Sequence, residues 1–230
     1  MYKTAIHKYT NQFPLTEGAR GRFYSNIFPF LECISVLEHA GKKLYSQKFK
    51  IAEEDHDVIF KLLVYFLRDE ENAKRLEIDF QKGILLTGPI GCGKTSLMNL
   101  MRYISAAFTH HIMISCREVS FQFIQEGFSV IHKYSHESFR FRTEKEPKIY
   151  CFDDLGVESN LKYYGNECNV MAEILLSRYD LFISHNMLTH ITTNLNSTEI
   201  EGLYGNRVRS RMREMFNLIG FDSGSEDKRC

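Results

Sequence analysis

Short apolar runs alternate with longer segments of helical periodicity along this chain. Apolar residues three and four positions apart predict helices, and the firmest of these is Glu54–Leu76. Further helices are predicted at Phe30–Tyr45, from Ser96 onward, and at Glu118–His132, Glu167–Tyr179 and Tyr204–Met215. Apolar or β-branched runs predict strands at Lys82–Thr87, Ile112–Ser115, Lys148–Phe152, His190–Thr193 and Phe216–Phe221. Strands that alternate with helices indicate an α/β fold with a mostly parallel sheet.

Length and composition limit what the chain can be. Its 230 residues, 43% of them hydrophobic, suffice for one substantial α/β core and an appended segment. No apolar run approaches the roughly 18 residues of a membrane span, and the first residues lack a signal peptide's apolar stretch. We therefore expect a cytoplasmic protein without a membrane partner. The six cysteines form no C-x-x-C pair, so we expect reduced thiols and no structural metal.

The formal net charge is zero, so the chain as a whole offers no electrostatic attraction to nucleic acid. Any contact with DNA must therefore be local. One candidate patch combines Lys133, Arg140, Arg142, Lys145 and Lys148, but glutamates are interleaved with it and a solvated charged loop is the alternative. A second candidate is the series Arg207, Arg209, Arg211 and Arg213.

A phosphate-binding motif follows the strand predicted at Lys82–Thr87. It has the pattern G-x-x-x-x-G-K-[ST], in which glycines let backbone N–H groups point at phosphate oxygens. Lys94 is expected to contact the β- and γ-phosphates, and the Thr95 hydroxyl to bind Mg²⁺. The next helix would turn its N-terminus, with its partial positive charge, toward the phosphates. The residues predicted to bind ATP are Gly88, Pro89, Ile90, Gly91, Cys92, Gly93, Lys94, Thr95 and Ser96.

A second motif is the β-prone run that ends in Asp153, Asp154, Leu155 and Gly156. It has the form of a Walker B strand, which delivers one carboxylate to the sheet edge beside the phosphate loop. Asp153 is expected to hold the Mg²⁺ shell together with Thr95. Asp154 is expected to orient or deprotonate the attacking water. The alternative is a solvated turn after a strand.

Asn194 ends the strand predicted at His190–Thr193. Beside the Walker B strand, its side chain is placed to hydrogen-bond the attacking water or the γ-phosphate. Local sequence equally permits an Asn that merely terminates a strand before a helix capped near Ser197.

The basic helix that follows carries four arginines at alternate positions. The four cannot all share one helical face, but Arg207 and Arg211, four residues apart, lie together. Such a pair can enter a neighbouring subunit's nucleotide site as arginine fingers, where a guanidinium stabilises charge on the transferring phosphoryl group. An exposed helix is the alternative.

Four segments in this order and spacing resemble the DnaC/IstB branch of AAA+ ATPases over about residues 80–221. They are Gly88–Thr95, Asp153–Gly156, Thr192–Asn196 and Tyr204–Met212. The resemblance implies a P-loop NTPase three-layer sandwich, an AAA+ core without the lid domain, with a small helical N-terminal segment. It implies that Asn194 is sensor 1, that Arg207 and Arg211 fall in the arginine-finger box, and that Arg211 is the first choice for the finger.

By this resemblance residues 1–50 are a partner-binding or accessory segment and residues 51–230 the ATPase domain. The implied activity is slow ATP hydrolysis with Mg²⁺, stimulated by DNA or a partner. The implied role is helicase loading in DNA replication or a helper function in transposition. The implied partners are single-stranded DNA, a replicative helicase or transposase, and further copies of the chain in a nucleotide-dependent oligomer.

Two departures from the wider AAA+ pattern bear on these expectations. Asp154 stands where a Glu is common, and its reach is shorter. The sequence also ends soon after Phe221, so we expect no helical lid domain. Two other classes of protein stay open: a P-loop kinase acting on a small molecule, and a nucleotide-gated binding module that hydrolyses ATP hardly at all.

Overall fold

A computed structural model of the chain describes residues 29–105, 109–140, 146–158, 161–163, 166–222 and 224–228. Residues 1–28, which belong to the segment expected to bind a partner, lie outside the described residues. The chain divides into two compact units. One unit comprises the residues up to Phe80 together with Ser96–His110, and the other comprises Gln81–Thr95 together with the residues from His111 onward.

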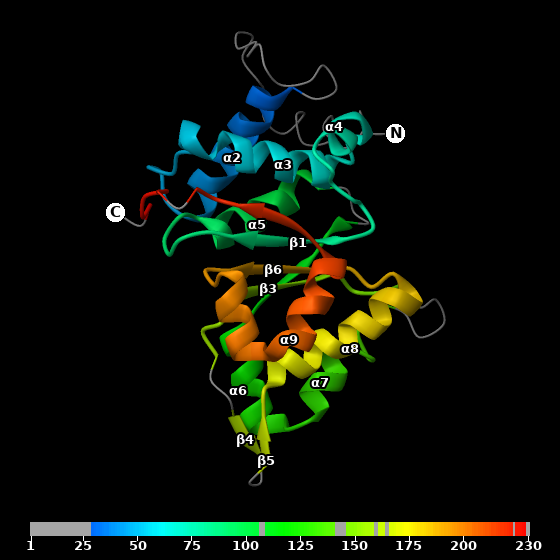
Figure 1. The fold of residues 1–230 in the computed structure, drawn as a ribbon. Coiled ribbons are helices and arrows are strands. Elements are labelled where there is room, and N and C mark those ends of the chain that lie inside the picture. Colours follow the sequence, from blue (N-terminus) through cyan, green and yellow to red (C-terminus); the bar gives the residue numbers. More distant parts are fainter. Residues whose placement is uncertain are drawn as a thin grey trace. The chain divides into compact units, whose positions relative to one another are not determined.

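The second unit is built on a five-stranded sheet (Figure 1). Every strand pair in it is parallel, and the strand order is β2-β3-β6-β1-β7. The strands are β1 (Gly83–Thr87), β2 (Ile112–Ser115), β3 (Tyr150–Leu155), β6 (Thr189–Thr193) and β7 (Phe216–Gly220). The predicted α/β fold is confirmed. Because the strands are parallel, the segments that follow β1, β3 and β6 emerge at one edge of the sheet, next to one another.

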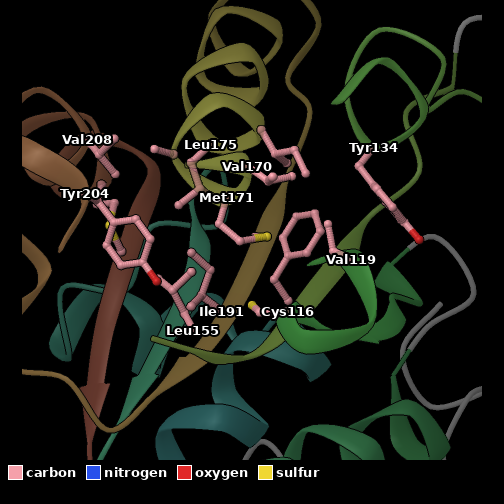
Figure 2. Close-up of a cluster of buried hydrophobic side chains, with 14 of the residues drawn as sticks. Cys116, Val119, Tyr134, Leu155, Val170, Met171, Leu175, Ile191, Tyr204 and Val208 are labelled. Carbon is pink, nitrogen blue, oxygen red and sulfur yellow. The ribbon is translucent and has the colours of Figure 1, made fainter. Parts of the chain in front are cut away.

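Among the residues of the second unit that the structure describes, four helices accompany this sheet (Figure 1). They are α6 (Cys116–Glu126), α7 (Ser129–Tyr134), α8 (Val170–His185) and α9 (Ser197–Met215). Their apolar faces meet in one buried cluster, in which Leu155 and Ile191 come from the strands (Figure 2). Removal of this apolar surface from water is the main force that holds the helices on the sheet. A two-stranded antiparallel ribbon, β4 (Leu161–Tyr163) and β5 (Asn166–Cys168), precedes α8.

Arg178 lies fully buried in the second unit. Its guanidinium donates to the Thr189 hydroxyl at 2.7 Å and to three backbone carbonyls, those of Tyr134 (2.8 Å), Leu188 (2.8 Å) and Lys148 (3.2 Å). Burial lowers the pKa of Arg178 from 12.5 to about 9. This side chain therefore joins α8 to α7, to the entry of β3 and to β6.

The first unit contains α2 (Phe30–Leu44), the short 3₁₀ helix η1 (Glu53–Asp55), α3 (His56–Leu67) and α4 (Glu70–Arg75). It also contains α5 (Lys94–Ile104) from Ser96 onward. Helix α3 is its centre, because eight of its residues between Val58 and Phe66 are buried. In the described part of the chain, no helix has the length and apolarity needed to cross a membrane.

Four of the predicted helices differ from those observed. The helix expected over Tyr204–Met215 is the second part of α9, which begins at Ser197 and kinks at Gly205. The helix expected over Glu54–Leu76 is broken, because Arg68 adopts a left-handed conformation and Asp69 caps a new helix by accepting from the Asn72 N–H. The helix expected over Glu118–His132 is broken at Gly127, whose φ is 66°. The helix expected from Glu167 begins only at Val170, because Asn166–Cys168 form a strand and Asn169 is the helix cap.

Candidate nucleotide-binding site

The phosphate loop connects β1 to α5. Its glycines Gly91 and Gly93 have φ values of 85° and 98°, which only glycine adopts at little cost. The buried ammonium of Lys94 donates to the carbonyl oxygens of Gly88 and Pro89, each at 2.8 Å. The loop therefore curls around its own lysine, directly before the first turn of α5. Ser96, the last residue predicted to bind ATP, is half-buried in that turn.

Thr95 and Asp153 meet beside this loop. The Thr95 hydroxyl lies 2.9 Å from Asp153 Oδ1 and 3.0 Å from Oδ2. Burial raises the pKa of Asp153, while the hydrogen bonds from Thr192 and Thr95 oppose this shift. The structure therefore brings these two residues together.

The oxygens of Thr95 and Asp153 are hard ligands of the kind that Mg²⁺ prefers. No cluster of three or more His, Cys, Asp or Glu side chains suited to a metal occurs among the residues that the structure describes. A site for Mg²⁺ does not require one, because this ion is usually bound by one or two protein oxygens together with substrate phosphates and water. The residues present therefore fit a metal that arrives with a nucleotide.

Asp154 has an unusual backbone conformation. Its φ is 56°, in the left-handed region, and the register between β3 and β6 shifts between Phe152 and Leu155. Aspartate tolerates this region better than most residues. The bulge is held by Thr192, whose hydroxyl accepts from the Asp154 N–H at 2.9 Å. The half-buried Asp154 thus occupies a fixed position one residue beyond the carboxylate that contacts Thr95.

Asn194 lies directly after β6, the strand between β1 and β3. It is exposed at the sheet edge from which the phosphate loop and the two aspartates also emerge. The cap of the following helix is another residue, since Asn196 accepts from the N–H groups of Thr198 and Glu199. Asn194 is thus not needed as a cap.

The two candidate finger arginines have different surroundings on α9. Arg207 is exposed, two residues after a kink in the helix at Gly205. The Arg211 guanidinium lies 4.2 Å from the centre of the Tyr179 ring, donates to its hydroxyl at 3.0 Å and pairs with Glu214 at 3.5 Å. The Tyr179 hydroxyl in turn donates to Glu214 at 2.7 Å. Arg211 is therefore held by its own subunit.

Most described members of the candidate basic patches are paired. Lys133 pairs with Glu126 at 3.4 Å, Arg140 with Glu146 at 3.5 Å, and Arg209 with Glu201 at 2.6 Å. Arg142 and Lys145 lie outside the described residues.

The sequence and fold of the chain were compared with those of known proteins. No protein-family model matches the chain. Proteasome-activating nucleotidases from Thermococcus gammatolerans and Pyrococcus furiosus are 33% identical to it over 90 residues, 39% of this chain and 21% of each relative. The match thus spans about a fifth of the length of these curated relatives.

Solved structures match a larger part of the chain. A crystal structure of the DnaC helicase loader superposes with a TM-score of 0.51 at 16% identity, covering 77% of this chain and 95% of the loader. The chain has the fold of the DnaC helicase loader. The resemblance to DnaC/IstB-like AAA+ ATPases is therefore confirmed at the level of the fold. A primosome component from Streptococcus pyogenes serotype M3 matches with a TM-score of 0.49 at 15% identity, over 76% of this chain and 83% of that protein.

Two features of this site were not predicted from the sequence. The first is Thr192, which donates to Asp153 Oδ1 at 2.6 Å in addition to its contact with Asp154. Both Thr192 and Thr193 are fully buried at the end of a strand. Consecutive hydroxyls in a buried strand are the signal that points to such a role, because each must find a partner there.

The second feature links the Walker B loop to the arginine-bearing helix. Glu158 accepts from the Gly156 N–H at 3.0 Å and from the Tyr204 hydroxyl. Burial, followed by the charge of Glu158, raises the pKa of Tyr204 far above its usual range, so Tyr204 stays a donor. Tyr204 directly precedes the kink at Gly205, so the Walker B loop is tied to the point where α9 bends.

The chain beyond β7 also reaches the phosphate loop. The Lys228 N–H donates to the Gly91 carbonyl at 3.1 Å, and the Asp227 carboxylate lies against the Gly91 Cα. A Cβ added to Gly91 would lie 2.1 Å from Asp227 Oδ1. The glycine at this position therefore permits both the turn of the loop and the approach of this segment.

Proposed function

We propose that this chain binds and slowly hydrolyses ATP at its phosphate loop and uses the nucleotide to load or recruit another protein onto DNA. The observation that carries the proposal is the contact of Thr95 with Asp153, which brings a Walker A hydroxyl and a Walker B carboxylate to one point beside the loop. The likeness in fold to a helicase loader supports a role in helicase loading. The equivalent recruitment step in transposition is the alternative role.

Each residue of the proposed site has a distinct task. The N–H groups of residues 88–95 and the start of α5 would bind the phosphates. The Lys94 ammonium donates to two loop carbonyls and to Cys92 Sγ, and it would exchange some of these contacts for phosphate oxygens when a nucleotide binds. Thr95 and Asp153 would hold Mg²⁺, which neutralises charge on the β- and γ-phosphates when it is bound. Asp154 would orient the attacking water and accept its proton, and Asn194 would hydrogen-bond the water or the γ-phosphate.

The remaining part of the proposed site comes from a second copy of the chain. A guanidinium aimed at the γ-phosphate stabilises charge in the transition state. Arg207 or Arg211 of a neighbouring subunit would supply it, so the oligomer would form when ATP is bound. Hydrolysis would then release the assembly.

The test is to measure ATP binding and turnover separately, with and without single-stranded DNA. Lys94→Ala is expected to abolish binding of a fluorescent ATP analogue. Asp154→Asn is expected to bind the analogue normally and to lower turnover by about 10²-fold, the usual contribution of a general base. Release of inorganic phosphate without any added acceptor distinguishes this activity from that of a kinase. Turnover that Lys94→Ala leaves unchanged would refute the assignment.

One observation favours a second candidate, the nucleotide-gated binding module. Asp154 has a short side chain and a left-handed backbone held by Thr192, so its reach toward a water molecule is limited. A wild-type protein that binds the analogue and assembles with it, yet releases no phosphate in a single-turnover experiment with DNA present, would establish this candidate instead.

A further inference from the structure

The segment after helix α2 folds back onto the helix in the first unit. The Phe49 ring packs on Gly41, where an added Cβ would lie 2.2 Å from a ring carbon. The Tyr45 ring lies 5.6 Å from the Phe49 ring, and the Ile51 N–H donates to the Glu38 carboxylate at 2.9 Å. The segment is thus pinned to α2 at both ends, and the side chains between these contacts project from a fixed backbone.

This segment carries a concentration of positive charge. Lys42, Lys43, Lys48 and Lys50 are all exposed. Lys42 and Lys43 occupy the last turn of α2, where lysine complements the helix dipole. Lys48 and Lys50 lie beyond the helix, so the dipole does not account for them. Within the ranges that the structure describes, no carboxylate pairs with Lys42, Lys48 or Lys50.

These lysines differ from four of the basic residues noted in the sequence. Lys133, Arg140, Arg209 and Arg211 are each paired with a glutamate, which cancels most of their attraction for a polyanion. In a chain of zero net charge, the surface formed by Lys42, Tyr45, Lys48 and Lys50 is therefore a local site of uncompensated positive charge. We call it the α2 basic surface.

An exposed aromatic ring lies within this surface. Tyr45 is 45% exposed although it packs beside Phe49. Proteins that bind single strands combine basic side chains along the backbone with aromatic rings on which bases stack. An acidic protein partner or a duplex would use the lysines but would leave the exposed ring without a role.

We propose that the α2 basic surface binds single-stranded nucleic acid, with phosphates on Lys42, Lys48 and Lys50 and one base stacked on Tyr45. This inference does not rest on the nucleotide site, since all of these residues belong to the first unit. The fixed segment would lower the entropy lost on binding, because the side chains start from an ordered backbone.

The test is fluorescence anisotropy of a labelled oligothymidylate with the full chain over a series of salt concentrations, without nucleotide and with a slowly hydrolysed ATP analogue. Lys48→Gln combined with Lys50→Gln removes two phosphate contacts. The slope of log K against log salt is then expected to become shallower by about 1.4, since each contact to a single strand contributes about 0.7. Tyr45→Ala is expected to weaken binding about tenfold at every salt concentration, and Tyr45→Phe to retain it.

The matched control is Lys74→Gln combined with Arg75→Gln, which removes the same charge from exposed positions on α4 in the same unit. It is expected to leave the slope unchanged, and thermal unfolding checks that every variant is folded. A wild-type protein that does not bind the oligonucleotide at low salt would overturn the proposal. A lysine variant that binds the oligonucleotide like wild type would also overturn it. An acidic protein surface would then be the remaining partner for these lysines. A lysine effect shared equally by duplex DNA, with no effect of Tyr45→Ala, would overturn the assignment to single strands.

Discussion

The Thr192 hydroxyl donates a 2.6 Å hydrogen bond to the Asp153 carboxylate across the pair formed by β3 and β6. The same oxygen accepts from the Asp154 N–H. One hydroxyl therefore fixes both the proposed metal ligand and the backbone that carries the proposed base. The contact follows from the pairing of β6 with β3 in the sheet.

Replacement of Thr192 by valine is expected to weaken the response to Mg²⁺. The substitution keeps the shape of the side chain but leaves one Asp153 oxygen and the Asp154 N–H without their partner. We expect the half-saturating Mg²⁺ concentration for ATP turnover to rise about tenfold, the lower end of the effect of losing a residue that orients a metal ligand. The measurement is a magnesium titration at saturating ATP.

Thr193→Val is the matched control for this experiment. Thr193 is equally buried on the same strand, but its hydroxyl contacts the Leu155 carbonyl and the Leu195 N–H rather than a carboxylate. It is expected to lose stability without a change in the magnesium titration. An equal shift in both variants would mean that Thr192 acts only through the packing of β6.

Asp153→Asn is expected to stabilise the protein in the absence of nucleotide and Mg²⁺. The raised pKa of Asp153 means that the folded state holds this proton more tightly than the unfolded chain does. At a pH above this raised pKa, the carboxylate is ionised and largely buried, which lowers the free energy of unfolding. At a pH below the pKa of the unfolded chain, the carboxyl is protonated in both states, and this loss disappears. We expect the melting temperature at neutral pH to rise by about 2–4 °C, which corresponds to ~1 kcal/mol for a chain of this size.

The pH dependence distinguishes this explanation from a general packing effect. The gain in melting temperature is expected to shrink as the pH falls through the range in which Asp153 becomes protonated. Asp180→Asn, which changes an exposed carboxylate on α8, is the control. A gain in Asp153→Asn that persists unchanged at acidic pH would show that the ionisation of Asp153 is not its source.

The sheet could be predicted from the sequence because each of its strands is a short apolar or β-branched run. The strands at Ile112–Ser115 and Thr189–Thr193, for example, agree with the expected bounds to within a residue. The ends of the helices could be predicted less well than the strands. The break at Arg68 depends on a left-handed residue that the periodicity of Glu54–Leu76 conceals, although Asp69 followed by two glutamates is a recognisable cap signal.

Contacts between distant residues could not be predicted. Thr192 contacts Asp153, 39 positions away, only because β6 pairs with β3 in one register. Arg178 lies on a helix whose sequence gives no sign that four acceptors surround the guanidinium. Motifs specify which residues do the chemistry. The residues that hold them in place follow from strand order and packing, which local sequence does not encode.

Arg178→Met is expected to be among the most destabilising substitutions in the second unit. Methionine fills much of the same volume, but it leaves the carbonyls of Tyr134, Leu188 and Lys148 without a donor. Each unsatisfied buried group costs roughly 1–3 kcal/mol, so we expect a loss of at least ~3 kcal/mol in the free energy of unfolding. Urea denaturation of the nucleotide-free protein measures it.

Lys133→Met is the control for Arg178→Met, because it removes a cation whose ion pair with Glu126 is exposed. Such a pair contributes at most about 1 kcal/mol, so this change is expected to be small. Similar losses in the two variants would mean that solvent satisfies the carbonyls around Arg178 when the guanidinium is removed.

A mixing experiment tests whether an arginine acts across subunits. Arg211→Ala removes the proposed finger but keeps the nucleotide site, whereas Lys94→Ala disables the site but keeps the finger. Arg211→Ala alone is expected to turn over ATP about 10³-fold more slowly than wild type, the lower end of the contribution of an arginine finger. Lys94→Ala alone is expected to show no turnover, because it does not bind ATP. An equimolar mixture is expected to recover turnover, because some interfaces pair an intact site with an intact finger.

Arg207→Ala, mixed in the same way, decides between the two arginines. Arg211 is held by Tyr179 and Glu214 and must leave them to reach a neighbour, whereas Arg207 is already exposed. If Arg211 is the finger, Tyr179→Phe removes one of its hydrogen bonds and is expected to raise turnover at low protein concentration. Recovery in mixtures with Arg207→Ala but not with Arg211→Ala would transfer the role to Arg207. The contact with Tyr179 would then be a structural link between α8 and α9.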